Sequence, residues 1–180
     1  MKKALIVVDM LNDFIMPDGA LYCGPTATAI VPNVLGRVLE YRDAGLPIFF
    51  LADNHTEDDK EFKRFPKHCI AGDPGADVIH VLAPGGVDGP NEFYIPKTRY
   101  SGFYNTDLER IMIQKWIIPE EHVIEVCGVC TSICCMMTVA DLANRDFNVV
   151  VHRNCVADFD QEAHNFALKY METILGATII

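Results

Sequence analysis

The sequence predicts an α/β fold: a doubly wound, mostly parallel sheet of about six strands between two layers of helices, a three-layer αβα arrangement. Short apolar runs alternate along the chain with segments whose apolar residues recur at helical spacing, a pattern typical of parallel sheets covered on both faces. The chain has 180 residues, 50% of them hydrophobic. That length suits one hydrophobic core, so we expect residues 1–180 to form a single domain.

The first expected elements are a strand, a helix and a second strand. The apolar run at 4–9 is too short for a helix and is expected to be a buried strand. Residues 27–44 have helical spacing, with Pro32 in an early turn or at a kink and Gly45 ending the helix. Residues 47–52, with the sequence PIFFLA, form the second expected strand.

The remaining elements continue this alternation after a long interruption. Residues 54–90 are polar and rich in Gly and Pro, so we expect only short helical pieces there. A segment of that length is typical of functional loops. Ser132 is expected to cap the helix that it begins. The later strands are expected at 92–96, 122–127, 148–152 and 177–180, and the helices at 107–115, 132–145 and 161–173.

Charge and cysteine content exclude several classes of protein. The net charge of −10 makes nucleic acid and anionic membrane surfaces unsuitable partners. No apolar stretch reaches the ~20 residues of a membrane span. The apolar start of the chain ends at Asp9 without a signal-peptide cleavage site, which favours a cytoplasmic protein. Seven cysteines, four of them within 127–135, indicate free thiols in a reducing compartment.

Reactive side chains follow four of the expected strands. Asp9 follows the first, Asp53 and His55 follow the second, Lys97 follows the third, and the segment 128–134 follows the fourth. In open parallel sheets ligands bind outside the carboxyl ends of the strands. The sequence therefore predicts a functional site at this edge of the sheet.

Cys134 is the candidate nucleophile of that site. It lies near the N-terminus of the expected helix 132–145, where the helix dipole favours a thiolate. A nearby Lys97 would lower the pKa of the thiol further. Asp9 could accept the thiol proton and later deliver it to a leaving amine. Alternatively, Cys134 is a small buried hydrophobic residue.

The polar segment provides a candidate metal site. Asp53, His55, Glu61 and His68 form a mixed nitrogen and oxygen set that suits Zn²⁺, Mn²⁺ or Fe²⁺. Alternatively, His68 caps a turn and Glu61 lies on a solvated face. A zinc or iron–sulfur site on the cysteines of 127–134 is disfavoured, because Cys127 belongs to a buried strand.

Three segments resemble the isochorismatase-like cysteine hydrolases. Residues 9–14 (DMLNDF) resemble the D-x-x-N-D-F opening of that family, and residues 97–103 (KTRYSGF) its K-x-x-x-S-x-F segment. Residues 128–134 (GVCTSIC) resemble G-V-x-T-D-x-C, which contains the nucleophile. The resemblance covers the whole chain in order and implies the same α/β fold.

The polar segment resembles the metal segment of one branch of that family, the nicotinamidases. Residues 53–55 match its D-x-H pattern, Glu61 the third ligand, and 65–72 its aromatic-Pro-x-His segment near a glycine. The resemblance implies hydrolysis of nicotinamide to nicotinate and ammonia, and of pyrazinamide as well. It also implies one divalent metal, with zinc first and manganese or iron as alternatives. We expect a homo-oligomer.

The resemblance also implies residue roles. Asp9, Lys97 and Cys134 would be catalytic, and the backbone amides of Cys130 and Cys134 would form the oxyanion hole. A non-proline cis peptide bond is implied between Val129 and Cys130. The metal ligands would be those given above, and the aromatic walls of the substrate pocket would be Phe14, Phe65 and Tyr100.

Three residues depart from the family pattern. Ser132 replaces an aspartate, Cys130 a small residue, and Phe65 a tryptophan. Cys130 could form a peroxide-induced bridge with Cys134, or it could point into the core. Two other functions remain open: a metal-free cysteine amidohydrolase of a carbamoyl or ureido amide, and a non-catalytic protein that senses thiols or metals.

Overall fold

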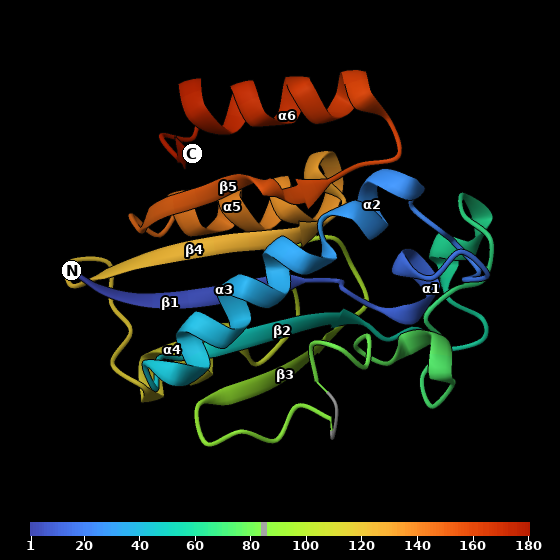
Figure 1. The fold of residues 1–180 in the computed structure, drawn as a ribbon, viewed down its shortest axis with the longest axis horizontal. Coiled ribbons are helices and arrows are strands. Elements are labelled where there is room, and N and C mark those ends of the chain that lie inside the picture. The colour runs from blue at the N-terminus through green and yellow to red at the C-terminus, as the bar shows by residue number, and fades with distance from the viewer. Residues whose placement is uncertain (84–85) are drawn as a thin grey trace.

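The computed structural model describes residues 1–83 and 86–180. Six strands form one sheet in the order β3-β2-β1-β4-β5-β6, and all neighbouring strands are parallel. The predicted α/β fold is therefore confirmed (Figure 1). The strands are β1 (Lys2–Val8), β2 (Ile48–Asp53), β3 (Glu92–Lys97), β4 (His122–Val129), β5 (Asn148–Ala157) and β6 (Thr178–Ile179).

Helices cover both faces of the sheet, because alternate residues of each buried strand face opposite layers. In β1, Leu5 packs in the cluster that includes α3, whereas Ile6 packs in the cluster that includes α4, α5 and α6. One layer contains α1 (Asn12–Ile15), α2 (Pro25–Ala29) and α3 (Val31–Asp43), and the other contains α4 (Leu108–Gln114), α5 (Met136–Ala143) and α6 (Gln161–Thr173).

Two predicted helices differ in detail from the observed ones. The helix predicted over 27–44 is divided at Ile30 into α2 and α3, and Pro32 lies in the first turn of α3. Proline is tolerated there because the first helical amides have no partner within the helix. The prediction that Ser132 caps its helix is wrong: Cys130 is the cap residue, and one turn of π-helix, η3 (Thr131–Cys135), precedes α5.

The long segment 54–90 folds against the carboxyl ends of the strands. It contains the predicted short helical pieces, the 3-10 turns η1 (Lys60–Lys63) and η2 (Pro74–Ala76), while its residues 84–85 lie outside the described residues. Side chains of α1 hold the segment in place. Asn12 donates to the carbonyl of Pro74 at 2.7 Å, and Asp13 accepts from the amide of Cys69 at 2.6 Å.

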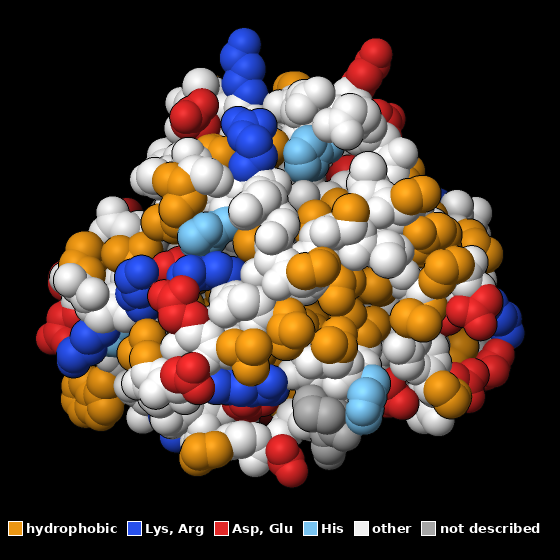
Figure 2. All heavy atoms as spheres, in the orientation of Figure 1, with side chains coloured by type: hydrophobic (Ala, Val, Ile, Leu, Met, Phe, Trp, Pro, Cys, Tyr) orange, Lys and Arg blue, Asp and Glu red, His pale blue; other side chains and the backbone are white. Residues whose placement is uncertain are grey.

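Charged side chains of both signs are scattered over the face shown in Figure 2, and a group of hydrophobic side chains lies near the centre of the same view. Across the described residues, every helix is too short or too polar to cross a membrane.

Candidate active site

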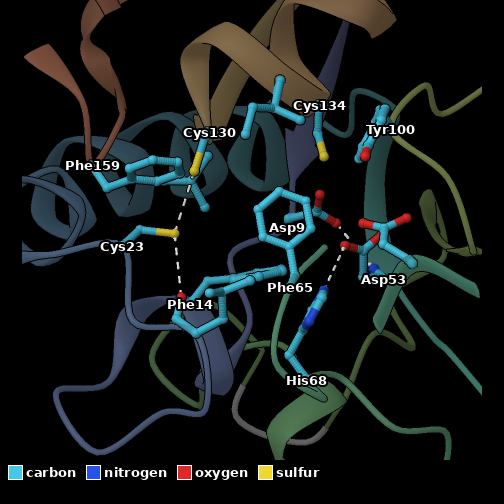
Figure 3. A pocket seen from close by; sticks show the side chains of 14 residues that line it. Asp9, Phe14, Cys23, Asp53, Phe65, His68, Tyr100, Cys130, Cys134 and Phe159 are labelled. Atoms are coloured by element: carbon cyan, nitrogen blue, oxygen red, sulfur yellow. Dashed lines mark hydrogen bonds and ion pairs between the residues drawn. The ribbon is translucent and has the colours of Figure 1, made fainter. Parts of the chain in front are cut away.

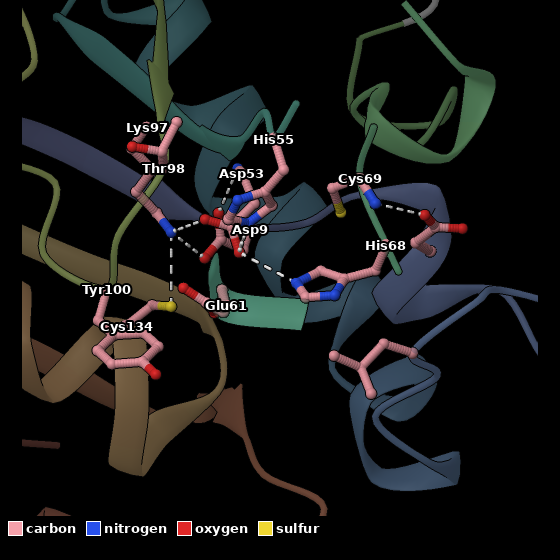
Figure 4. Close-up of polar contacts among 12 residues, drawn as sticks. Asp9, Asp53, His55, Glu61, His68, Cys69, Lys97, Thr98, Tyr100 and Cys134 are labelled. Carbon is pink, nitrogen blue, oxygen red and sulfur yellow. Dashed lines mark hydrogen bonds and ion pairs between the residues drawn. The ribbon is translucent and has the colours of Figure 1, made fainter. Parts of the chain in front are cut away.

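The four strands whose ends carry reactive side chains are neighbours in the sheet. Asp53 and Lys97, the last residues of β2 and β3, are register partners. Asp9 directly follows β1, and its carboxylate accepts from the amide of Asp53 at 3.0 Å. Cys134 lies in η3, which follows β4. The structure therefore brings the predicted catalytic residues together, as shown in Figure 4.

Lys97 connects the other three groups. Its ammonium lies 2.8 Å from Asp9 Oδ2 and 3.5 Å from Cys134 Sγ, and it also contacts Asp53 Oδ1. The whole side chain is buried, with 2% of its surface exposed. A buried ammonium is stable only when it is paired, and here two carboxylates pair with it.

These contacts separate the pKa values of the two carboxylates. Burial and the neighbouring Asp53 raise the pKa of Asp9 to about 7, against the opposing effect of Lys97. At Asp53 burial also raises the pKa, but Lys97 and His55 together outweigh this effect, so the pKa of Asp53 is lowered. Asp53 thus stays ionised, while Asp9 can take up and release a proton near neutral pH.

The thiol of Cys134 differs electrostatically from the prediction. Burial raises the pKa of Cys134 well above its usual range, and the charge of Lys97 opposes this shift without overcoming it. The expected thiolate at the helix end is therefore replaced by a protonated thiol, whose sulfur lies within 4.8 Å of a carboxylate oxygen of Asp9. A carboxylate placed to receive the thiol proton becomes more important in this arrangement.

Next to this group lies a cluster of metal-type ligands. Asp53, His55 and His68 are buried, and one ligand atom from each lies within 4.8 Å of the others. Asp53 Oδ2 is 3.7 Å from His55 Nε2 and 3.9 Å from His68 Nε2. Because Asp53 Oδ1 faces Lys97, this carboxylate is shared between the ammonium and the ligand cluster.

The polar atoms of the cluster fit a divalent cation. Nδ1 of His55 pairs with Asp59 at 3.1 Å, and Nδ1 of His68 with the carbonyl of Pro66 at 2.7 Å, so both Nε2 atoms face inward. The buried atoms His55 Nε2 and Glu61 Oε2 have no hydrogen-bond partner among the described residues. Unpaired buried nitrogen and oxygen atoms beside a carboxylate are the donors expected of a Zn²⁺, Mn²⁺ or Fe²⁺ site.

A pocket opens onto both groups. Phe14, Phe65 and Tyr100, the aromatic residues singled out in the sequence, line this pocket together with Cys134 and Glu61. Figure 3 shows the carboxylates and His68 at one side of this pocket and Phe159 at the other. Sequence reasoning missed five apolar lining residues, because nothing in their local pattern marks them as pocket residues: Leu21, Cys23, Val129, Ile133 and Phe159.

Cys130 faces a thiol that the sequence did not predict. Its Sγ lies 3.3 Å from Cys23 Sγ, and both side chains are buried in the pocket wall. The two residues are 107 positions apart, so only the folded chain reveals the pair. The peptide bond between Val129 and Cys130 is cis, in agreement with the prediction.

Two carboxylates that support the site were also missed. Asp59 holds His55 and is itself held by Arg99 at 3.0 Å. The four-residue spacing from His55 was a usable signal, but three consecutive acidic residues, 57–59, made it ambiguous. Asp158 contacts Ser132 in η3 from 26 residues away, a separation at which no local pattern exists.

Comparison with known proteins gives consistent matches over nearly the full length. Residues 3–180 match the isochorismatase domain. PncA of Bacillus subtilis, described as an uncharacterized isochorismatase family protein, is 38% identical over 99% of both chains. The crystal structure of the nicotinamidase/pyrazinamidase PncA from Bacillus subtilis superposes with a TM-score of 0.92 at 36% identity, over 99% of each chain.

A further structural match includes a metal. The pyrazinamidase of Pyrococcus horikoshii, crystallised in complex with zinc, superposes with a TM-score of 0.86 at 31% identity. The alignment covers 100% of this chain and 99% of that protein. The fold implied by the sequence motifs is thus shared with these proteins over almost the whole chain.

Proposed function

The chain belongs to the isochorismatase family, and from this premise we propose that it is a metal-dependent cysteine amidohydrolase of one domain, residues 1–180. Its proposed reaction is the hydrolysis of nicotinamide to nicotinate and ammonia, with pyrazinamide as a second substrate. The observation that carries the proposal is Lys97, whose buried ammonium contacts Asp9, Asp53 and the Cys134 thiol beside the ligand cluster.

The first half of the reaction forms a thioester and releases ammonia. Asp9 accepts the thiol proton of Cys134 as the sulfur attacks the amide carbon. The negative charge that develops on the amide oxygen is received by the backbone amides of Cys130 and Cys134, which lie at the start and within η3. Asp9 then returns its proton to the departing nitrogen, and the carbon–nitrogen bond breaks.

The second half clears the thioester. Asp9, again ionised, takes a proton from water, and the resulting hydroxide attacks the thioester carbon. The carbon–sulfur bond then breaks, and the proton held by Asp9 restores the Cys134 thiol. The product leaves as the carboxylic acid, which loses its proton to water to give nicotinate. A carboxyl group whose pKa is raised to about 7 can act in both directions at neutral pH. Lys97 keeps its charge throughout, because the two carboxylates hold the pKa of its ammonium well above its usual range despite burial.

Substrate orientation is assigned to the ligand cluster and the aromatic walls. Asp53, His55, Glu61 and His68 would hold the divalent cation, for which zinc is the first choice. When bound, the cation supplies a Lewis-acid contact for the ring nitrogen of the substrate. Phe14, Phe65 and Tyr100 offer flat apolar surfaces on the pocket wall to the ring.

The test is ammonia release from nicotinamide by the purified protein and by two cysteine variants. Cys134→Ala should lower kcat by at least about 10³-fold, since no other group replaces the nucleophile. Cys135→Ala is the matched control, because this neighbouring thiol is also buried but, unlike Cys134, is not among the described residues that line the pocket, and the variant should remain active. An active Cys134→Ala protein of native fold contradicts the thioester mechanism.

A further inference from the structure

The carboxylate of Asp158 anchors the turn that contains Cys134. Asp158 follows β5 and is buried, with 4% of its surface exposed. Its Oδ2 accepts two hydrogen bonds from Ser132, one from the backbone amide at 2.8 Å and one from the hydroxyl at 2.7 Å. Its Oδ1 accepts from the amide of Asp160 at 3.2 Å. Both oxygens are therefore used.

Ser132 lies in η3 between the two residues whose amides face the reacting oxygen in the proposed mechanism. Amides at the start of a helix have no partner within it, and a carboxylate there satisfies one of them and complements the dipole. A double contact with amide and hydroxyl fixes the turn more firmly than either bond alone. The position of Ser132 in turn fixes the backbone of Cys130 and Cys134 on its two sides.

The anchor is itself held in place. The carbonyl of Asp158 accepts from the Thr26 hydroxyl in α2 at 3.0 Å. One residue before Ser132, the hydroxyl of Thr131 pairs with His164 of α6 at 2.9 Å. Residues of both helical layers thus contact the start of η3 or the residue that holds it. Among these contacts, the one between Asp158 and Ser132 involves a carboxylate.

We propose that Asp158 is a positioning residue for the reaction: by holding Ser132 it sets the orientation of the Cys134 thiol and of the amides of Cys130 and Cys134. This role rests on the proposed function. The side chains of Ser132 and Asp158 form a complementary pair of one hydroxyl and one carboxylate. A double variant in which the two residues are exchanged still has one hydroxyl and one carboxylate at this contact. It should therefore keep the contact that a substitution of either residue alone removes.

The experiment compares wild type with Asp158→Ser, Ser132→Asp and the double variant Ser132→Asp/Asp158→Ser. Asp158→Ser loses a charge-assisted contact, so kcat for nicotinamide should fall at least about tenfold with KM changed less than about threefold. Ser132→Asp places two carboxylates against each other, so its kcat for nicotinamide should fall by a similar factor. The kcat of the double variant should lie within about threefold of the wild-type kcat.

Asp160→Ser is the matched control, because it removes the same charge from the same loop. The side chain of Asp160 is exposed, and among the described residues it accepts only from the amides of Glu162 and Ala163 at the start of α6. Its kcat should equal that of wild type. A stable Asp158→Ser protein with wild-type kcat, or a folded double variant at least as impaired as the worse single variant, overturns the proposal. Asp158→Asn, which keeps the shape, serves if Asp158→Ser does not fold.

A measurement without substrate separates this proposal from the proposed function. Iodoacetamide labelling of Cys134, localised by fragmentation mass spectrometry, should be at least about threefold slower in Asp158→Ser than in wild type and restored in the double variant. If Asp158 acted only through its charge, its removal would favour the thiolate and accelerate labelling. A wild-type protein that releases no ammonia, with labelling as expected, contradicts the proposed function and leaves the positioning role supported.

Discussion

Lys97 illustrates how one buried side chain can organise reactive groups from several strands. Its ammonium pairs with Asp9 and Asp53, and it has no contact with bulk water to weaken these interactions. Coulombic effects between buried charges are larger than those on the surface. The same charge also faces the sulfur of Cys134, so its loss should affect chemistry as well as stability.

Lys97→Met should therefore lower kcat for nicotinamide by at least about 100-fold, a loss typical of removing a preorganised charge from an active site. Two carboxylates would also lose their buried partner, which lowers the free energy of unfolding by about 3 kcal/mol. Steady-state kinetics and urea unfolding measure the two effects. Lys2→Met, which removes an exposed lysine paired with Glu121, should change neither. A kcat within threefold of wild type would rule out the assigned role of Lys97.

At the scale of elements, the ligand cluster depends on a loop that α1 holds in place. His55 lies two residues after the end of β2, whereas Glu61 lies in η1 and His68 comes after η1. Asp13 of α1 fixes the amide of Cys69, next to His68. The cluster is thus assembled from a strand end and a loop that is hydrogen-bonded to a separate helix.

Replacing either histidine should remove metal from the protein. His55→Ala and His68→Ala are each expected to reduce the zinc content of purified protein at least about tenfold and to raise KM for nicotinamide, because each loses one ligand. His80→Ala, an exposed histidine of the same long segment, is the control. Elemental analysis of each protein measures the metal. Active wild-type protein without metal would instead favour the metal-free amidohydrolase.

The end of β4 depends on the absence of a side chain at Gly128. Its φ is +116°, and a Cβ there would lie 2.0 Å from the carbonyl oxygen of Val8 in β1. Gly128→Ala should lower the free energy of unfolding by about 3 kcal/mol or more. Gly36→Ala, in the exposed face of α3 with open space around it, should instead stabilise by about 0.5–1 kcal/mol. Chemical denaturation of both variants tests this contrast.

At the scale of the whole molecule, Glu125 links three elements around the central strand β4. Its carboxylate pairs with Lys3 of β1 at 2.9 Å, with His152 of β5 at 2.8 Å, and with Arg37 of α3. The side chain is 3% exposed. These partners lower the pKa of Glu125 to about 2, although burial opposes the shift.

A carboxylate with a lowered pKa stabilises the fold above its unfolded-state pKa of 4.5 and loses that contribution as the pH falls toward 2. Glu125→Gln should therefore lower the free energy of unfolding by about 2 kcal/mol at pH 7 and flatten its decline between pH 4.5 and 2. Urea unfolding across this range measures both. Glu121→Gln, which changes an exposed ion pair, is the control and should have the same free energy of unfolding as wild type across this pH range. An unchanged pH dependence of unfolding in Glu125→Gln would contradict the prediction.

The sequence by itself determined most of the architecture and much of the site. Hydrophobic periodicity is a local property, so it located the strands and most of the helices. The rule that parallel strands present their carboxyl ends at one edge then grouped Asp9, Asp53, Lys97 and Cys134 before any contact was known. The structure places these four side chains together, as that rule predicts.

Only the tertiary structure decided the features that depend on burial or on contacts between distant segments. The raised pKa of Cys134 arises from desolvation, which exists only after the surrounding layers have packed. The contact of Cys23 with Cys130 and that of Asp158 with Ser132 join residues 107 and 26 positions apart. No helical or strand period extends over such separations, so these pairs are fixed by how the layers pack rather than by the local order of residues.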